Sequence, residues 1–350
     1  QTLSSHGLRD GFLALYDLTN SQWTAANSIG STSNEESRSF IKLTNGSYSV
    51  IGTSAGNMSA NSSIPGAPDC TSGTSSTILC TYIVYLSASL TPTGMASLHS
   101  TGNVVGMDLV EIGTSGQILV TGSFNKVMAY STGSVESQGG TENDIFVTRF
   151  SAQGTQNLLA AFGGTGKDEA RSIVPTSTGF AVSGVTESTN LSQSSVYKPS
   201  SGWTAPIGQG GKDILILQLS STGLITDGFT FGTQQADAVG EIDVDENNFI
   251  YMTGYLGSTF QHPTMNITLG VLNKRSAYVG IVNLSGGNTS HLSDIYASTG
   301  SNNGDGRSNA VAVLNSDDFW IGGRLSPGAS TNTFFGQQAF GYDQAGYILR

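Results

Sequence analysis

The sequence predicts an all-β fold: a single β-propeller of five four-stranded antiparallel blades, with six as the alternative, and long loops on one face. Glycine accounts for 46 of the 350 residues, and only 11% of the residues are charged. Apolar residues are concentrated in strand-length runs such as 145–150 and 214–219. Short apolar runs between turn-forming residues are typical of turn-rich β proteins.

The first element of the repeat is a strand, a short polar turn and a second strand that ends in a small-residue glycine motif. Five copies end at glycines spaced 70, 62, 70 and 68 residues apart, namely Gly52, Gly122, Gly184, Gly254 and Gly322. A near-constant spacing over the whole chain indicates a repeat architecture.

The second element is an apolar strand, a turn and a weaker strand. Its six copies lie at residues 10–28, 81–100, 144–164, 213–232, 277–298 and 339–350. Together, the two elements give four short strands per period, as in the blade of a β-propeller. We therefore predict one domain over residues 1–350, built from the half-unit 10–28 and repeats at about 38–100, 104–164, 168–232, 237–298 and 305–350.

The connections between the second and third strands of the repeats are long. They span residues 56–77, 123–143, 186–211 and 256–276. In a meander of this kind these connections leave the same face, so we expect them to share one face of the propeller. Long loops on a rigid scaffold are a common place for binding sites.

Three sequence motifs carry a resemblance to a known family. They are GGTGKDEARSIV at residues 163–174, GFAVSG at 179–184 and DIFVTRFSAQG at 144–154. The pattern resembles the Gly-rich extracellular β-propeller repeats of bacterial-type surface and secreted proteins, and it covers nearly the whole chain. The resemblance implies an extracellular propeller used in adhesion, scaffolding or carbohydrate binding, because one fold serves many functions.

The odd half-unit 10–28 suggests how copies of the protein could associate. Six copies of the second element against five of the first leave its apolar strand, GFLALYDL, without an assigned partner. One solution is a sixth, incomplete blade; otherwise the strand is an edge that the protein must cover or use. If the strand is used, we expect Phe12, Leu13, Leu15 and Tyr16 to add to a neighbouring subunit. The predicted partners are therefore other copies of the chain, or other extracellular proteins and glycans, and the predicted assembly is a homopolymer.

Charge and hydropathy restrict the partners further. The net charge is −11 with only 14 basic residues, so the chain lacks the basic surface that nucleic acids require. No apolar run approaches the roughly 20 residues of a membrane span, so we expect no membrane insertion. The chain begins at Gln1, which is typical of a mature protein whose leader has been removed, and predicts a secreted or cell-surface location.

The cysteines and asparagines are consistent with that location. Cys70 and Cys80 flank a Gly/Ser/Thr-rich loop, and we expect a disulfide between them rather than two free thiols. Seven Asn-x-Ser/Thr sequons fall in expected turns, loops or strand ends, where glycans could be attached: Asn45, Asn57, Asn61, Asn190, Asn266, Asn283 and Asn288.

Calcium is the one cofactor with any support in the sequence. Asp243, Asp245 and Asn247 place oxygen atoms at alternate positions, as at the start of a calcium loop. The run lacks the glycine and the closing carboxylate of such a loop, and a hairpin turn explains it as well. We therefore predict no cofactor and keep these three residues as weak metal candidates.

Acidic residues raise the question of glycoside cleavage, which needs two carboxylates at a defined separation. The candidates lie on the expected innermost strands and in the loops that lead into them: Asp108, Glu111, Asp168, Glu169, Asp237, Glu241, Asp243 and Asp305. A turn-forming role explains acids that recur at equivalent positions. Because no catalytic motif is present, we predict that the protein is not an enzyme.

The remaining candidate is a sugar-binding platform made by Tyr197 and Trp203 in the third long loop. Exposed aromatic rings can stack on sugars, although such rings often pin a loop to its blade. The sequence therefore favours a secreted structural or adhesive propeller, a subunit of a surface filament or layer. A carbohydrate-binding propeller is the alternative, and a glycoside hydrolase or polysaccharide lyase is the second alternative.

Overall fold

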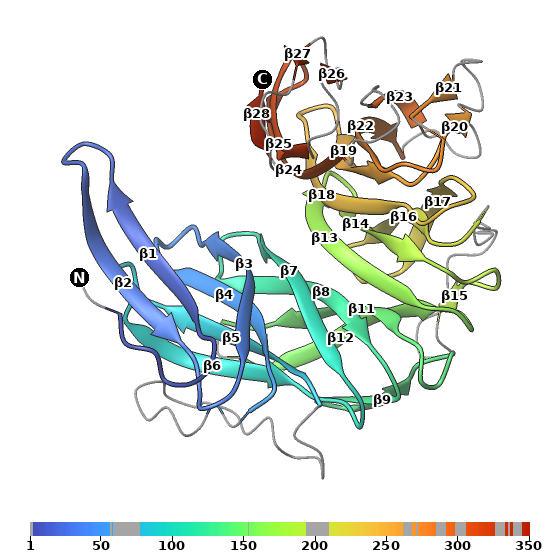
Figure 1. Cartoon of the computed structure of the whole chain (residues 1–350). Helices are drawn as coiled ribbons and strands as arrows, with labels where there is room; N and C mark the ends of the chain where they lie inside the picture. Colours follow the sequence, from blue (N-terminus) through green and yellow to red (C-terminus); the bar gives the residue numbers. More distant parts are fainter. Residues whose placement is uncertain are drawn as a thin grey trace. The chain divides into compact units, whose positions relative to one another are not determined.

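The computed structural model shows an all-β chain (Figure 1). It describes residues 3–56, 58, 78–152, 154–193, 210–261, 268–270, 272–284, 292–297, 306–325, 333–334, 337–338 and 345–350. The chain divides into two compact units. The first comprises Gln1–Gly163 and Ser194–Tyr197, and the second comprises Gly164–Gln193 and Lys198–Arg350. The prediction of one domain over residues 1–350 stays a prediction.

The first unit contains a two-stranded ribbon and two propeller blades. The ribbon is formed by β1 (Gly11–Asp17) and β2 (Gln22–Ile29). Blade 1 is an antiparallel sheet of β3 (Glu35–Lys42), β4 (Tyr48–Ser54), β5 (Cys80–Leu86) and β6 (Pro92–Leu98). Blade 2 contains β7 (Val104–Ile112), β8 (Gln117–Phe124), β11 (Asp144–Phe150) and β12 (Gln156–Gly163).

The second unit contains three blades. Blade 3 is the sheet of β13 (Asp168–Thr176), β14 (Gly179–Thr186), β16 (Asp213–Ser220) and β17 (Ile225–Phe231). Blade 4 is the sheet of β18 (Ala238–Val244), β19 (Phe249–Leu256), β22 (Ser276–Asn283) and β23 (Leu292–Ala297). Blade 5 has three described strands, β24 (Gly306–Asn315), β25 (Asp318–Leu325) and β28 (Ala345–Leu349).

These five blade sheets confirm the predicted all-β propeller fold. The described residues contain no α-helix. The remaining strands are short, namely β9 (Val127–Tyr130), β10 (Gly133–Glu136), β15 (Ser192–Gln193), β20 (Phe260–Gln261), β21 (Thr268–Leu269), β26 (Thr333–Phe334) and β27 (Gln337–Gln338). The β9–β10 hairpin shows how one long connection is held, because Met128 and Val135 are buried in the apolar core of blades 1 and 2.

The third strand of a blade is buried on both faces, which explains its continuous apolar sequence. In blade 3 all residues of β16 except the last are buried. Ile214 and Ile216 pack with residues of blade 4 in one apolar cluster that includes Ile242 and Met252. Burial of apolar surface between neighbouring sheets is therefore what holds consecutive blades of this unit together.

A β-bulge at the same place in every innermost strand aligns the five repeats. The residue before each bulge pairs with a glycine of the second strand, in the pairs Ser37–Gly52, Gly106–Gly122, Ala170–Gly184, Val239–Gly254 and Ser308–Gly323. In blade 5 the paired glycine is thus one residue beyond the expected Gly322. This register identifies positions that are equivalent between blades.

The N-terminal strand differs from the prediction. The sequence predicts an unpaired strand, but β1 pairs along its whole length with β2. The hairpin closes through Asp17, whose Oδ1 accepts hydrogen bonds from the backbone nitrogens of Thr19 (2.8 Å) and Asn20 (3.2 Å). A local partner therefore satisfies one edge of β1, because closing a short turn costs little chain entropy.

Candidate functional site

The inner face of the ribbon packs against blade 1. Leu13 and Ile29 of the ribbon are buried in one cluster with Val50, Tyr82 and Val84 of the blade. The Nδ2 of Asn27 donates a hydrogen bond to the carbonyl of Leu90 (2.9 Å). The ribbon therefore covers blade 1 as a preceding blade would, although it has only two strands.

The outer face of the ribbon is apolar and exposed. Phe12 is 63% exposed and Trp23 is 60% exposed, and Tyr16 and Leu18 are also exposed. The rings of Tyr16 and Trp23 meet edge to face with centroids 5.0 Å apart. We call Phe12, Tyr16, Leu18 and Trp23 the ribbon face. Of the four residues predicted for assembly, Phe12 and Tyr16 belong to this face, whereas Leu13 and Leu15 point toward blade 1.

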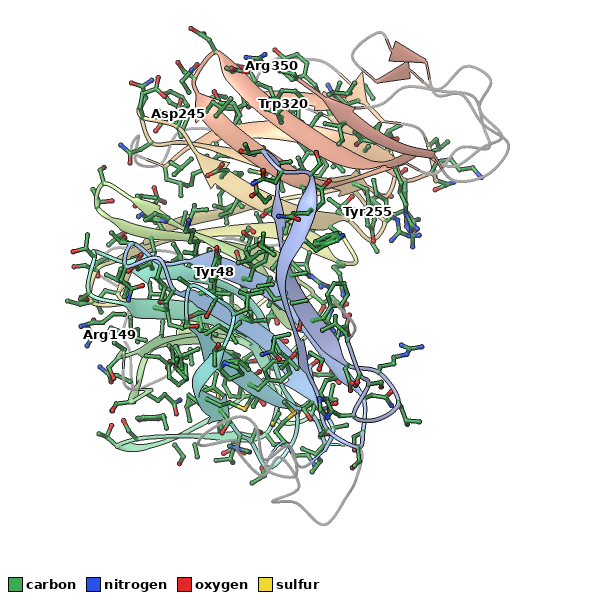
Figure 2. All side chains as sticks on the ribbon, turned by 90° about the vertical axis from the view of Figure 1, so that its left-hand side faces the viewer. Tyr48, Arg149, Asp245, Tyr255, Trp320 and Arg350 are labelled. Carbon is green, nitrogen blue, oxygen red and sulfur yellow. The ribbon has the colours of Figure 1, made fainter. Side chains whose placement is uncertain are left out.

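Blade 5 carries a second exposed apolar face, which the sequence did not predict. Ile348 is 74% exposed, Leu314 is 66% exposed and Trp320 is 40% exposed. They lie on the sheet face opposite Val311, Ile321 and Leu349, which pack toward blade 4. We call these three exposed residues the blade 5 face. Figure 2 labels Trp320 beside Arg350, whose guanidinium lies 5.5 Å from the ring centroid.

Buried acids close the loops that lead into the innermost strands. Glu35, Asp168 and Asp237 each accept a hydrogen bond from the backbone nitrogen four residues earlier. Asp168 also accepts from Ser188 Oγ (2.8 Å), and Asp237 also accepts from the backbone nitrogen of Gly257 (2.7 Å). Asp168 and Asp237 are therefore loop-forming residues, as their recurrence suggested.

Burial changes the pKa of two of these carboxyl groups. Burial raises the pKa of Asp237 to about 6. The hydrogen bonds from Thr233 and Gly257 lower this pKa, and the nearby carboxylate of Asp213 raises it. A Cβ on Gly232 would collide with both of these carboxylates, which shows how closely they approach. Burial likewise raises the pKa of Asp168.

Acids on the innermost strands bond to the neighbouring blade. Asp243 Oδ2 accepts from the backbone nitrogen of Val313 (2.7 Å), and Glu241 Oε2 accepts from that of Val311 (3.3 Å). In the first unit, Glu111 Oε2 accepts from the backbone nitrogen of Thr44 (2.7 Å), and Asp108 Oδ1 accepts from Ser39 Oγ (2.7 Å). These carboxylates thus satisfy polar groups on or beside an adjacent edge strand. Asp305 lies outside the described residues.

The weak calcium candidates form a hairpin turn. Asp245 Oδ1 accepts from the backbone nitrogens of Asn247 (2.9 Å) and Phe249 (2.8 Å). Asp243 instead points to β24, as described above. In the described part of the chain, no group of three or more His, Cys, Asp or Glu side chains could hold a metal ion. The hairpin alternative accounts for these contacts.

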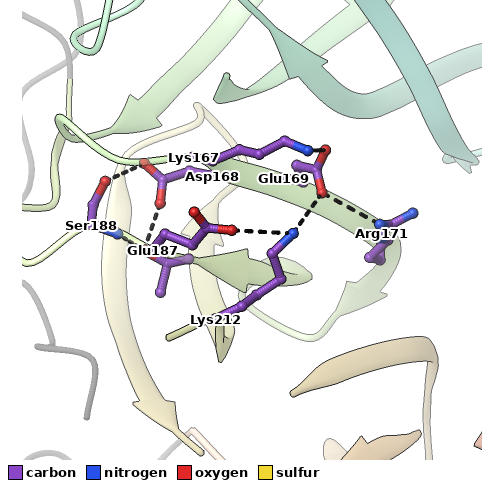
Figure 3. A network of polar contacts seen from close by, with 8 residues as sticks. Lys167, Asp168, Glu169, Arg171, Glu187, Ser188 and Lys212 are labelled. Atoms are coloured by element: carbon purple, nitrogen blue, oxygen red, sulfur yellow. Dashed lines mark hydrogen bonds and ion pairs between the residues drawn. The ribbon is translucent and has the colours of Figure 1, made fainter. Parts of the chain in front are cut away.

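Glu169 organises a charged cluster in the second unit (Figure 3). Its carboxylate lies 2.9 Å from Lys167 Nζ, 3.4 Å from Arg171 and 3.4 Å from Lys212, which also reaches Glu187. Burial raises the pKa of Glu169, but the bond from Lys167 and the charges of Lys212 and Arg171 outweigh it and hold the pKa below its usual range. Two carboxylates therefore neutralise much of the charge of three cations.

The cysteines and sequons are described only in part. Cys80 is buried at the start of β5 and is not a free thiol. Its predicted partner, Cys70, lies outside the described residues, so the pairing stays a prediction. Asn45 and Asn190 are exposed, and Asn283 is half-buried at the end of β22. The other sequons lie outside the described residues, namely Asn57, Asn61, Asn266 and Asn288.

The predicted sugar platform, Tyr197 and Trp203, also lies outside the described residues. A different aromatic residue holds two cations that sequence reasoning did not group. The guanidinium carbons of Arg275 and Arg307 lie 5.0 and 5.1 Å from the ring centroid of Tyr255. An alignment of the repeats at the residue before each bulge pair would have shown one change of charge. This residue is Glu36 in blade 1 and Glu169 in blade 3, but Arg307 in blade 5.

Comparison with known proteins does not assign the chain to a family. No protein-family model matches the chain, and no curated protein matches it. Among the described residues there is no helix with the length and apolar character needed to span a bilayer.

Proposed function

We propose that this protein is a secreted, extracellular β-propeller that serves as a structural or adhesive subunit and polymerises through its two exposed apolar faces. The ribbon face of one copy packs on the blade 5 face of the next. The observation that carries the proposal is the presence of one such face on the two-stranded ribbon at the start of the chain and another on blade 5 near its end.

The chemistry of the faces supports their association. Each presents exposed aromatic or aliphatic side chains, and contiguous apolar surface of this kind marks interaction sites in soluble proteins. Tyr16, Trp23 and Trp320 are residue types enriched at protein interfaces. Because the two faces differ, their contact is heterologous, and a heterologous contact that does not close into a ring produces a filament.

The edges of the ribbon offer a further means of linking subunits. Among the described residues of the first unit, no other strand pairs with either edge of the β1–β2 ribbon. In blade 5, β28 is one of the two edge strands of the described three-stranded sheet. Edge strands present backbone donors and acceptors that a neighbouring chain can use. Strand addition thus remains compatible with a paired β1.

Sedimentation velocity and negative-stain microscopy of the wild type and two double variants test the proposal. The wild type is expected to form concentration-dependent polymers. Phe12→Ser/Trp23→Ser and Trp320→Ser/Ile348→Ser each remove one face and should each stay monomeric. An equimolar mixture of the two variants still contains one intact face of each kind, so it should form dimers and no longer species.

The matched control is Phe40→Ser, because Phe40 is an equally exposed aromatic side chain (58%) on β3 of blade 1. This variant should polymerise like the wild type. A wild type that stays monomeric at all concentrations would overturn the proposal, as would polymers that persist in both double variants.

A further inference from the structure

The two exposed apolar faces correspond to the two sides of a contact that is buried inside the second unit. Blades 3 and 4 pack together through one apolar cluster, which contains residues of both sheets. The strand registers identify the position in this cluster that corresponds to each exposed residue. The buried contact therefore shows which element packs on a face of either kind.

The ribbon face corresponds to the side of blade 4 that packs on blade 3. A β-bulge precedes the pair Tyr16–Trp23 in the ribbon, and a bulge at the same place precedes the pair Val282–Leu292 in blade 4. Counted from these pairs, the blade 4 residues that correspond to Phe12, Tyr16, Leu18 and Trp23 are Tyr278, Val282, Leu284 and Leu292. All four belong to the buried cluster. The ribbon thus exposes the side that a blade turns toward the preceding blade.

The blade 5 face corresponds to the side of blade 3 that packs on blade 4. Counted from the glycines of the bulge pairs in the two blades, Ile348 corresponds to Ile216. On the second strands, Trp320 corresponds in the same way to Ala181. Ile216 and Ala181 both belong to the buried cluster. Blade 5 thus exposes the side that a blade turns toward the following blade.

We infer that a second copy of the chain completes this contact, so that the ribbon of one copy packs on blade 5 of another as blade 4 packs on blade 3. The inference rests on the proposed polymerisation and adds the geometry of the contact between copies. A single chain exposes both sides of the contact, the one on the ribbon and the other on blade 5. A second copy therefore offers the matching side to each face, and the order of blades continues from one copy to the next.

The contact between copies lacks two strands of a complete blade. The ribbon supplies the counterparts of the third and fourth strands of blade 4, whereas the first two strands contribute Ile242 and Met252 to the buried cluster. On blade 5, Trp320 stands where blade 3 has Ala181. The larger indole ring offsets part of the apolar area that the missing strands would bury. We therefore expect a reversible contact, weaker than the packing of consecutive blades in one chain.

Sedimentation velocity of two single variants tests this geometry, because Ile348 and Leu314 of the blade 5 face are similarly exposed (74% and 66%). Leu314 is the extra residue of a second bulge in β24, which β13 lacks, so it has no counterpart in the buried cluster. Ile348→Ser should raise the dissociation constant between copies at least about tenfold. Leu314→Ser should raise it less than about threefold.

Phe12→Ser and Trp320→Ala extend the series to the other side of the contact and to a second residue of blade 5. Each should raise the dissociation constant at least about tenfold, because each removes a ring whose counterpart lies in the buried cluster. The matched control is Leu272→Ser, since Leu272 is equally exposed in the second unit (67%) but belongs to neither face. This variant should stay within about twofold of the wild type.

The outcomes separate the geometry from polymerisation itself. Equal weakening by Leu314→Ser and Ile348→Ser would overturn the inference and leave the proposed polymerisation standing. Polymers of unchanged stability in Phe12→Ser or Trp320→Ala would have the same meaning. A wild type that stays monomeric at all concentrations would overturn both the inference and the proposed function.

Discussion

The ribbon strand β1 and the blade strand β16 occupy the same position of the repeat but are buried to very different extents. Counted from Asp10 and Asp213, which begin the two copies, Phe12 corresponds to Leu215. Phe12 is 63% exposed, whereas Leu215 is 1% exposed. Similar apolar strands therefore reach different environments. Burial in this repeat depends on the strands and blades that surround a strand, not on its own sequence alone.

The largest expected effect is on the free energy of unfolding, and it is tested by one substitution in the core and one on the surface. Leu215→Ala should lower the free energy of unfolding by about 2 to 5 kcal/mol, because it leaves a cavity in a closely packed region. Phe12→Ala should change it by less than about 0.5 kcal/mol, because the side chain is mostly in water. Urea unfolding of monomeric protein measures both values. Equal losses would show that the ribbon strand is buried in solution.

The loops that follow the ribbon and blade 3 provide a second test, which measures how protein stability changes with pH. The pKa of Asp237 is about 6 in the folded protein against 3.8 for a free side chain. The folded state thus holds a proton that the unfolded state has released, and Asp237 lowers stability as pH rises from about 4 to 6, by about 3 kcal/mol in total. Above pH 6 its contribution is constant.

Asp237→Asn isolates this contribution from that of the other carboxyl groups. As the pH rises from 4 to 6, the wild type should lose stability relative to the Asp237→Asn variant. Above pH 6 the difference between their free energies of unfolding should level off. Glu35→Gln, at the equivalent junction after the ribbon, serves as the comparison. A wild type and an Asp237→Asn variant with parallel stability curves would contradict the assigned pKa.

The sequence was sufficient to predict the blades, because the repeat places a glycine of the second strand at nearly constant intervals. It was not sufficient to place β1. An apolar run such as GFLALYDL is equally compatible with a local partner or a distant one, and the turn at residues 18–21 decided the matter. The Arg275 and Arg307 cluster was missed for a different reason, since residues 32 positions apart meet only when the strand register is known.

The smallest expected effect is on how often the turn between β1 and β2 opens. Asp17→Ala removes the acceptor of the bonds from Thr19 and Asn20, so the end of the hairpin should open more often. Amide hydrogen exchange in β1 and β2 should speed up roughly severalfold, while exchange in β16 stays unchanged. Acceleration in β16 as well would mean that the ribbon and blade 3 open together.

The bonds between innermost strands also restrict how the blades can be ordered. Glu241 and Asp243 of blade 4 reach Val311 and Val313 of blade 5, each 70 residues further along the chain, and Asp108 of blade 2 reaches Ser39 of blade 1. The acids come from blades 2 and 4, and their partners come from blades 1 and 5. Exchanging blades would separate Asp108 from the hydroxyl group of Ser39, so a shuffled version of this chain should be less stable even if every blade kept its own fold.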